Sequence, residues 1–318
     1  MAPKVSVVLP VYNQENYFSE TLDSILAQTH CDFEVVIIDD GSTDKTASII
    51  KRYASRDSRI RAFFFENAGR AAATNKAVEL SSGEYCALID ADDVMMPDRL
   101  EKQLAFRLAN PEVPASSSHC YYIDEKGRFK GVQSYGNLST KEECETATRE
   151  RRIVLCAITG VMIRRSDYLE VGGLDGRFWP CDDVEFVNRL LDNKKIVIIL
   201  PAVLMKYRVH QSSVTAKSQW KTIEMGRYVS YCIQARREGL RELTFEQFKR
   251  EIDSVSWFIN IRRRAHAYSV IYQRRAGFSW YGKQYHKFVC QIAIAFLLNR
   301  KYVIGSMKKR KRLKFSAA

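Results

Sequence analysis

Acidic side chains gather at two places in this chain, each directly after a short apolar run. Asp90-Ala91-Asp92-Asp93 follows Tyr85–Ile89, and Asp39-Asp40 follows Phe33–Ile38. Carboxylates this close together repel one another, so a fold that brings them to a strand's end usually neutralises them with a cation. If the two runs are parallel strands, their ends meet at one edge of a sheet. The spacing therefore predicts a site for a hard metal ion and a nucleotide; the alternative is that each cluster only caps a loop.

The elements that must position these carboxylates alternate through the first 110 residues. Four apolar runs, too short for helices, are predicted to be buried strands, and they are Val5–Pro10, Phe33–Asp39, Ile60–Phe65 and Tyr85–Ile89. Apolar residues at helical spacing predict a helix after each strand, over residues 17–28, 43–53, 70–80 and 97–108. This order predicts an α/β fold whose central sheet is mostly parallel, with flanking helices and right-handed crossovers.

The pattern loosens after Pro111. Residues 115–123 are predicted to form a strand followed by a hairpin turn at 124–127, and residues 136–152 form either a loop or a helix. Short helices are expected at 165–171 and 184–191, with two strands at 196–200 and 203–207. We place a domain boundary near residues 216–219. Residues 1–216 then form one domain, with halves 1–110 and 111–216, and residues 217–318 form a mainly helical extension.

Charge is distributed unevenly along the chain. Of the net charge of +13, residues 217–318 carry +17 and residues 1–216 carry −4. No acidic residue follows Asp253, whereas basic residues, including the tail Lys308–Lys314, alternate with aromatic ones. This composition favours an anionic membrane surface as the partner of the extension. A solvated face or an oligomer contact remains an alternative, and no nucleic-acid-binding motif supports a nucleic-acid partner.

The eight cysteines include no CxxC pair, which argues against a zinc site. We interpret them as reduced thiols of a cytosolic protein. The N-terminus leads directly into a predicted strand, so we expect no signal peptide. The longest strongly apolar stretch, Ile292–Leu298, is much shorter than the ~20 residues of a membrane-spanning helix. The expected location is the cytoplasm, peripheral to the inner face of the membrane.

Six motifs, in order and spacing, resemble those of family 2 glycosyltransferases. They are Val5–Asn13, Asp39–Asp44, Asn67-Ala68-Gly69, Asp90–Asp93, Gly172–Asp175 and Asp182-Asp183. The resemblance covers about residues 3–212 and implies the GT-A fold, in which a nucleotide-binding sheet is fused to an acceptor-binding half. It also implies an inverting enzyme that uses Mg²⁺ or Mn²⁺ and a nucleotide-sugar donor, with a uridine diphosphate sugar favoured. The chain lacks the Gln-x-x-Arg-Trp segment and spanning helices of processive synthases, so single-sugar addition to a saccharide or lipid-linked saccharide is expected.

The resemblance assigns donor contacts along the predicted sheet edge. Residues implied in nucleotide-sugar binding are Pro10, Val11, Tyr12, Asp39, Asp40, Asn67, Gly69, Arg70, Asn75, Asp90, Ala91 and Asp92. Tyr12 is expected to stack on the base, or else to plug the strand end, and Asp40 to bind the base. The metal ligands are Asp92, Asp93 and His210, with a structural role for His210 as the alternative. Where the family has Ala-Arg-Asn, this chain has Ala73-Thr74-Asn75, so Arg70 either supplies the missing charge or is a solvated helix residue.

The catalytic assignment rests on the second acidic pair. Asp183 resembles the general base that takes the acceptor's hydroxyl proton, and Asp182 stands where the family usually has glutamate. Their alternative role is capping of the helix that follows, and Arg189 either orients the pair or is exposed. The resemblance further places Gly160 at the acceptor. Trp179 is expected either to form a wall for the acceptor sugar, because an aromatic face suits the apolar face of a pyranose, or to belong to the core.

Two other functions compete with this interpretation. A nucleotidyltransferase would need a glycine-rich phosphate loop after the first strand, and Val11–Glu15 provides none. A catalytically inactive nucleotide-binding scaffold is supported only by the missing Ala-Arg-Asn arginine.

Overall fold

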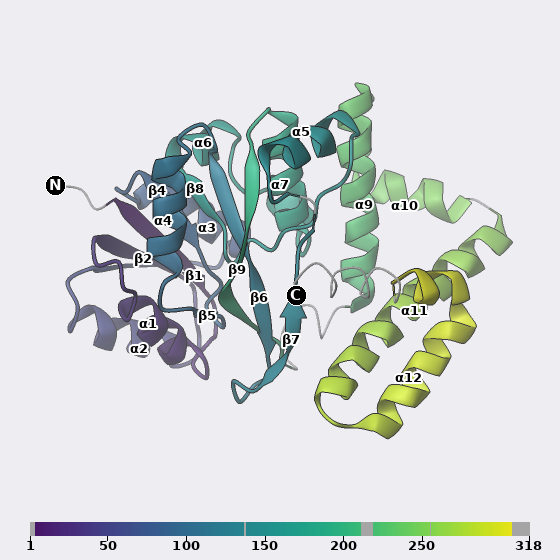
Figure 1. The fold of residues 1–318 in the computed structure, drawn as a ribbon, viewed down its shortest axis with the longest axis horizontal. Helices are drawn as coiled ribbons and strands as arrows, with labels where there is room; N and C mark the ends of the chain where they lie inside the picture. Colours follow the sequence, from purple (N-terminus) through teal and green to yellow (C-terminus); the bar gives the residue numbers. More distant parts are fainter. Residues whose placement is uncertain (1–3, 137, 211–218, 255, 307–318) are drawn as a thin grey trace. The chain divides into compact units, whose positions relative to one another are not determined.

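The computed structural model describes residues 4–136, 138–210, 219–254 and 256–306 (Figure 1). The strands are β1 Val5–Val11, β2 Phe33–Asp40, β3 Ile60–Phe65, β4 Tyr85–Leu88, β5 Val94–Met95, β6 Ala115–Ile123, β7 Phe129–Gln133, β8 Met162–Arg164 and β9 Val197–Arg208. The helices are α1 Phe18–Leu26, α2 Thr46–Ala54, α3 Arg70–Leu80, α4 Arg99–Ala109, α5 Lys141–Arg149, α6 Arg165–Glu170, α7 Asp182–Asp192, α9 Gln219–Glu238, α10 Phe245–Ser254, α11 Trp257–Tyr281 and α12 Tyr285–Leu298, with a 3-10 turn at Gly176–Phe178.

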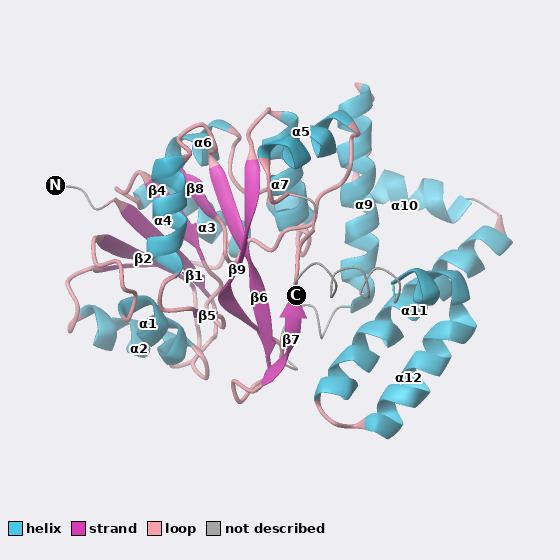
Figure 2. Cartoon of the chain, viewed as in Figure 1, coloured by secondary structure: helices cyan, strands magenta, loops and turns pink. Residues whose placement is uncertain are grey.

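The chain divides into two compact units. One comprises Met1–Ser213 together with Met225–Leu240, and the other comprises Val214–Glu224 together with Arg241–Ala318. The first unit holds the sheet, and the second is helical where the structure describes it (Figure 2). Among the described residues, no helix combines the length and apolar content needed to cross a membrane. The basic tail at 308–314 lies outside the described residues.

One sheet organises the first unit. Its strand order is β3-β2-β1-β4-β8-β6-β9-β5, with β7 paired to β6. The four strands β3, β2, β1 and β4 are parallel, as predicted. Their near-continuous apolar sequences suit burial on both faces, and every residue of β2 is buried. The short strand β8 then runs antiparallel between β4 and β6 and joins the two halves of the sheet.

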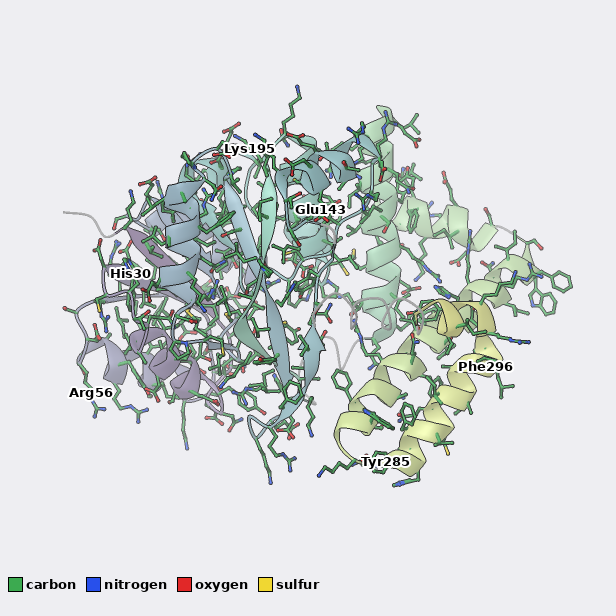
Figure 3. All side chains as sticks on the ribbon, in the orientation of Figure 1. His30, Arg56, Glu143, Lys195, Tyr285 and Phe296 are labelled. Atoms are coloured by element: carbon green, nitrogen blue, oxygen red, sulfur yellow. The ribbon has the colours of Figure 1, made fainter. Side chains whose placement is uncertain are left out.

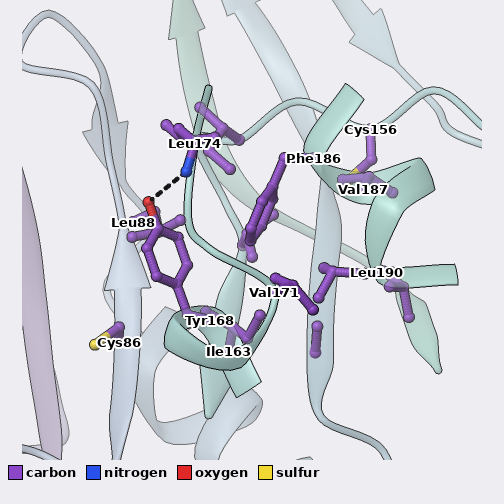
Figure 4. Packing of buried hydrophobic residues seen from close by; sticks show 14 of the residues in the cluster. Cys86, Leu88, Cys156, Ile163, Tyr168, Val171, Leu174, Phe186, Val187 and Leu190 are labelled. Atoms are coloured by element: carbon purple, nitrogen blue, oxygen red, sulfur yellow. Dashed lines mark hydrogen bonds between the residues drawn. The ribbon is translucent and has the colours of Figure 1, made fainter. Parts of the chain in front are cut away.

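Helices cover both faces of this sheet, and each face has its own core. On one side α1, α2 and α4 pack against alternate residues of β1 and β2, including Val7, Leu9 and Ile37. On the other side α3, α5, α6 and α7 pack against the residues between them, including Val8 and Val36. Figure 4 shows part of this second core. The period of two in the strands thus distributes the buried side chains over two faces.

Two details differ from the sequence prediction. The two strands expected at 196–200 and 203–207 are one strand, β9, which pairs in parallel with β6 through two register shifts. The first shift lies between Leu200 and Val203 and spans Pro201, which has no N–H to give to the ladder; the second lies between Val203 and Met205. The pairing pattern is therefore interrupted although the strand continues. Residues 141–149, left open as loop or helix, form α5, whose first turn is capped by the Thr140 side chain.

A buried carboxylate holds together the sheet edge opposite the acidic clusters. Glu34 accepts hydrogen bonds from Ser6 Oγ at 2.6 Å and from the Ser82 amide at 2.6 Å, and it pairs with Arg61 at 2.6 Å. Burial alone would raise the pKa of Glu34, but these hydrogen bonds lower it to about 2. The folded state therefore favours the ionised form of this side chain.

Replacing Glu34 by glutamine is expected to reduce the free energy of unfolding by roughly 2–3 kcal/mol at neutral pH. The pKa of Glu34 falls on folding from 4.5 to about 2, so its contribution is complete above about pH 4.5 and disappears as the pH falls through about 2. Urea unfolding of wild type and Glu34→Gln across this range measures it. Exposed Glu112→Gln is the control, and a Glu34→Gln effect no larger than that control would contradict the prediction.

Candidate active site

The two acidic clusters meet at one edge of the sheet, as the sequence predicts. β1 lies between β2 and β4, so the carboxyl ends of these strands are neighbours. Asp39 and Asp40 end β2, and Asp90 follows β4. Pro10 and Val11 are the last residues of β1, where the Val11 side chain belongs to the core, and Tyr12 beyond them is 47% exposed. The exposed ring of Tyr12 rules out the plug interpretation and leaves it free to stack on a ligand.

The loops after β1 and β2 support each other. Asn13 Oδ1 accepts from the Thr43 amide at 2.8 Å, and Asp39 Oδ1 accepts from the Ser42 amide at 3.0 Å. Gly41 has a φ of +76°, and a Cβ there would lie 2.8 Å from the Asn67 nitrogen. Only glycine fits this close approach, so the motif around Gly41 is needed for the loop conformation itself.

Asp40 binds the loop after β3. Its two carboxylate oxygens accept from the Ala68 amide at 2.8 Å and the Gly69 amide at 3.0 Å, and its carbonyl accepts from Asn67 Nδ2 at 2.8 Å. The resemblance assigns Asn67 and Gly69 of this loop to the nucleotide sugar and Asp40 to its base. In the structure these groups bind one another instead, and they fix the start of α3.

Arg70 connects the two acidic motifs. Its Nε lies 3.0 Å from Asp90 Oδ1, and its Nη1 lies 3.1 and 3.2 Å from the two carboxylate oxygens of Asp182. The guanidinium also lies over the Trp179 ring, 5.4 Å from its centroid. Burial would lower the pKa of Arg70, but the carboxylates of Asp90 and Asp182 raise it above its ordinary value. Arg70 is therefore a partly buried ion-pair partner, and the solvated alternative is wrong.

Asp182 and Asp183 begin α7 and differ in environment. Asp182 is fully buried against Arg70, whereas Asp183 is partly exposed and accepts from the Val184 amide at 2.8 Å. Burial and the neighbouring Asp182 charge raise the pKa of Asp183 to about 7. The N-cap of α7 is Cys181, so capping does not account for the pair. A partly exposed carboxylate with a pKa near 7 is suited to accept a proton at neutral pH.

Asp92 and Asp93, which follow β4, lie in different environments. Asp92 Oδ2 lies 2.9 Å from His210 Nε2. Asp93 is only 1% exposed, and its Oδ1 accepts from the Arg208 amide at 2.8 Å. Burial and the nearby Asp92 and Asp90 charges raise the pKa of Asp93 well above its ordinary value. The predicted set of Asp92, Asp93 and His210 therefore needs correction, since in the described part of the chain no three such side chains converge into a metal site.

Arg208 was not among the predicted site residues, yet it holds this loop in place. Its Nε donates to the Asp92 carbonyl at 2.8 Å and its Nη2 pairs with Glu20 at 2.6 Å. The guanidinium lies over the Tyr17 ring, 4.9 Å from the centroid. Its position two residues before His210, at the end of an apolar strand, was the available signal.

Some predicted ligand contacts are used for packing instead. Asn75 Oδ1 accepts from the Leu174 amide at 2.8 Å and from the Tyr168 hydroxyl at 2.6 Å, and its Nδ2 donates to the Leu174 carbonyl at 2.8 Å. A Cβ at Gly173 would lie 2.4 Å from Asn75 Oδ1, so this turn and the α3 side chain fit closely. The donor contact predicted for Asn75 is corrected to a structural role.

Gly160, Ala91 and Arg189 also make their contacts within the protein. Gly160 is buried, with its amide on the Leu88 carbonyl and its carbonyl accepting from Gln103, so the predicted acceptor contact through its backbone is corrected. The Ala91 carbonyl accepts from Thr21 Oγ1 at 2.9 Å. Arg189 pairs with Glu185 at 2.8 Å and donates to the backbone carbonyls of Val171 and Gly173. It does not orient the Asp182–Asp183 pair.

Comparison with protein families shows which family the chain belongs to. Residues 6–172 match the model of glycosyl transferase family 2. The chain belongs to this family. An uncharacterized glycosyltransferase of Methanocaldococcus jannaschii is 34% identical over 210 residues, which cover 65% of this chain and 71% of that protein. By contrast, this chain spans only 19–21% of three similar Rickettsia glycosyltransferases.

Solved structures of glycosyltransferases share the fold. Staphylococcus aureus TarS, residues 1–349 with UDP-GlcNAc, gives a TM-score of 0.58 at 17% identity, covering 95% of this chain and 92% of that one. The mannosyltransferase PcManGT of Pyrobaculum calidifontis, with GDP-Man and Mn²⁺, gives 0.52 at 18% identity, covering 94% and 87%. The expected GT-A fold is confirmed, and the family 2 chain is a glycosyltransferase.

Proposed function

We propose that this glycosyltransferase is inverting and metal-dependent, and that it moves one sugar from a nucleotide-sugar donor, a uridine diphosphate sugar, to a saccharide hydroxyl. The observation that carries the proposal is Asp183, whose pKa of about 7 fits a general base. It adjoins Asp182, which Arg70 links to Asp90 of the acidic loop. Structures of the same fold hold UDP-GlcNAc in TarS and GDP-Man with Mn²⁺ in PcManGT, which supports this donor class.

Asp92 and His210 fit a divalent ion as two of its ligands. Two ligand atoms at adjacent corners of an octahedron are about 3 Å apart when each lies about 2.1 Å from the metal. Asp92 Oδ2 and His210 Nε2 are 2.9 Å apart. A carboxylate oxygen suits Mn²⁺ or Mg²⁺, and the imidazole nitrogen favours Mn²⁺ of these two; diphosphate oxygens would complete the set. When bound, the ion would stabilise the negative charge of the departing nucleoside diphosphate.

The chain's own side chains then have distinct tasks. Asp183 removes the proton from the acceptor hydroxyl as that oxygen attacks the anomeric carbon. Asp182 and Arg70 hold the start of α7 beside the acidic loop. The exposed ring of Tyr12 stacks on the base, and the half-buried Trp179, fixed by Arg70, forms a wall for the acceptor sugar.

A lipid-linked saccharide at an anionic membrane is the acceptor that best suits the basic C-terminal region, and a soluble saccharide is the alternative. That region lacks acidic residues after Asp253, so an anionic surface on the cytoplasmic side would attract it. The scaffold hypothesis depended on the missing arginine of the Ala-Arg-Asn motif. Arg70 now places a guanidinium between the acidic motifs, which removes that support.

Thermal unfolding with a panel of nucleotide sugars tests the donor. A uridine diphosphate sugar with Mn²⁺ is expected to raise the melting temperature by several degrees at a concentration about 100 times its dissociation constant. The same sugar without Mn²⁺ should raise it less, and the parent sugar should have no effect. If no nucleotide sugar stabilises the protein with or without a divalent ion, the proposed function is wrong.

A further inference from the structure

The helical hairpin α11–α12 has small and polar residues where its two helices meet. Ser269 Oγ donates to the Ala295 carbonyl at 2.7 Å, and Ser279 Oγ donates to Gln291 Oε1 at 2.8 Å. Ala267, Ala276 and Ala295 are completely buried. Helices that pack through small residues and interhelical hydrogen bonds are typical of an apolar solvent, because there the large apolar side chains do not need to face one another.

The exposed residues of α12 are correspondingly apolar, except His286 and Lys287 in its first turn. Exposed side chains at helical spacing on its outward face are Tyr285, Val289, Ala293, Phe296 and Leu297. Leu297 is 85% exposed and Val289 is 59% exposed. Tyr285 and Phe296, near the two ends of the helix, are labelled in Figure 3. A helix in water normally shows the opposite arrangement, with its apolar stripe turned inward. Within the described part of the second unit, this face stays exposed apart from the ring contacts of Tyr285 with Trp280 and of Phe296 with Arg300.

Basic and aromatic residues around the outward face of α12 indicate what kind of partner covers this face. Lys283, Lys287, Arg300 and Lys301 flank the apolar face at both ends of α12, and residues 254–318 contain no acidic side chain. At the turn between the helices, the Trp280 ring lies 5.4 Å from Tyr285 and 5.0 Å from Phe288. Tryptophan, tyrosine and basic residues around an apolar core are typical of the interface of an anionic membrane. A second copy would bring equally basic helices together, which their like charges disfavour.

We infer that the hairpin α11–α12 is a membrane-docking element, in which the outward face of α12 enters one leaflet of an anionic bilayer. The basic residues at the ends of α12 then contact lipid headgroups. α12 has 14 residues and is about 21 Å long, shorter than the ~30 Å hydrocarbon core, so it lies in the interface. This inference rests on the proposed function in one respect: the docked hairpin would bring the enzyme to a lipid-linked acceptor.

Sedimentation with vesicles tests the docking face in the full chain. Wild type is expected to bind vesicles of phosphatidylcholine with phosphatidylglycerol, and to bind pure phosphatidylcholine vesicles much less. The double variant Val289→Glu with Leu297→Glu is expected to lose about tenfold or more of its partitioning. Leu108→Glu, at a 57% exposed leucine in the first unit, is the matched control and should bind as wild type does. Equal binding by the double variant would overturn the inference.

A fluorescent probe on α12 reports directly whether this helix inserts into the membrane. Cys290 is exposed and can carry an environment-sensitive fluorophore once the other exposed cysteine is removed by Cys31→Ser. Anionic vesicles should shift its emission to the blue, and lipids spin-labelled in their acyl chains should quench it. A shift that depends on protein concentration and is not quenched by such lipids would identify a second copy as the partner and overturn the inference. Donor-induced thermal stabilisation, measured on the same samples without vesicles, shows separately whether the proposed function holds.

Discussion

Asp183→Asn is expected to lower sugar transfer by about 10²–10⁴-fold while donor binding stays within a small factor of wild type. Asparagine keeps the size of the side chain and its acceptor for the Val184 amide, but it cannot take a proton from the acceptor hydroxyl. Transfer is measured with the donor and acceptor at saturation, and donor binding by calorimetry with Mn²⁺. Unchanged transfer by the variant would remove Asp183 from the mechanism.

The pH dependence gives an independent check of the same residue. Because Asp183 must be ionised, kcat/KM should fall about tenfold per pH unit below the pKa of about 7. Asp182→Asn is the companion variant. The Asp182 charge raises the pKa of Asp183 and Arg70 lowers it, so removing the former should move the acidic limb to lower pH. An acidic limb that stays in place in Asp182→Asn would show that the two carboxyl groups are not coupled in this way.

Much of the fold follows from local pattern. β1 and β2 were predictable because strands buried on both faces are near-continuous apolar runs, and α3 because the alanine-rich sequence between β3 and β4 favours helix. β8 and β5 were not predicted, since strands of three and two residues show no periodicity. They form because β4, β6 and β9 offer unpaired edges, which is a property of the assembled sheet.

In the site, the motifs predict which residues come together but not how their side chains are oriented. That Asp39-Asp40 and Asp90–Asp93 meet followed from parallel strands ending at one edge, and this was predictable. The direction of each side chain was not. The Asn75 side chain lies against the backbone at Gly173, where the absence of a Cβ leaves room for it. The Asp40 carboxylate points to the loop that contains Asn67. Such choices depend on contacts between segments that are distant in the sequence.

The neighbouring residues Asp92 and Asp93 allow a test of whether side-chain direction decides which carboxylate binds the metal. We expect a large effect on donor binding from Asp92 and none from Asp93. Asp92→Asn and His210→Ala should each weaken Mn²⁺-dependent donor binding by about 100-fold or more, because each removes a proposed ligand where even loss of a supporting contact costs 10–100-fold. Calorimetry with the donor, with and without Mn²⁺, measures this loss. Binding without the metal should change little in either variant, since neither side chain is assigned to the base.

Asp93→Asn is the matched control, one residue away. The raised pKa of Asp93 means that the folded protein disfavours its charged form, and asparagine keeps a carbonyl oxygen for the Arg208 amide. Asp93→Asn should therefore keep Mn²⁺-dependent binding close to wild type and leave the melting temperature unchanged or higher. If it loses metal-dependent binding as Asp92→Asn does, the two carboxylates share the ion, and the separation of their roles at the end of β4 is wrong.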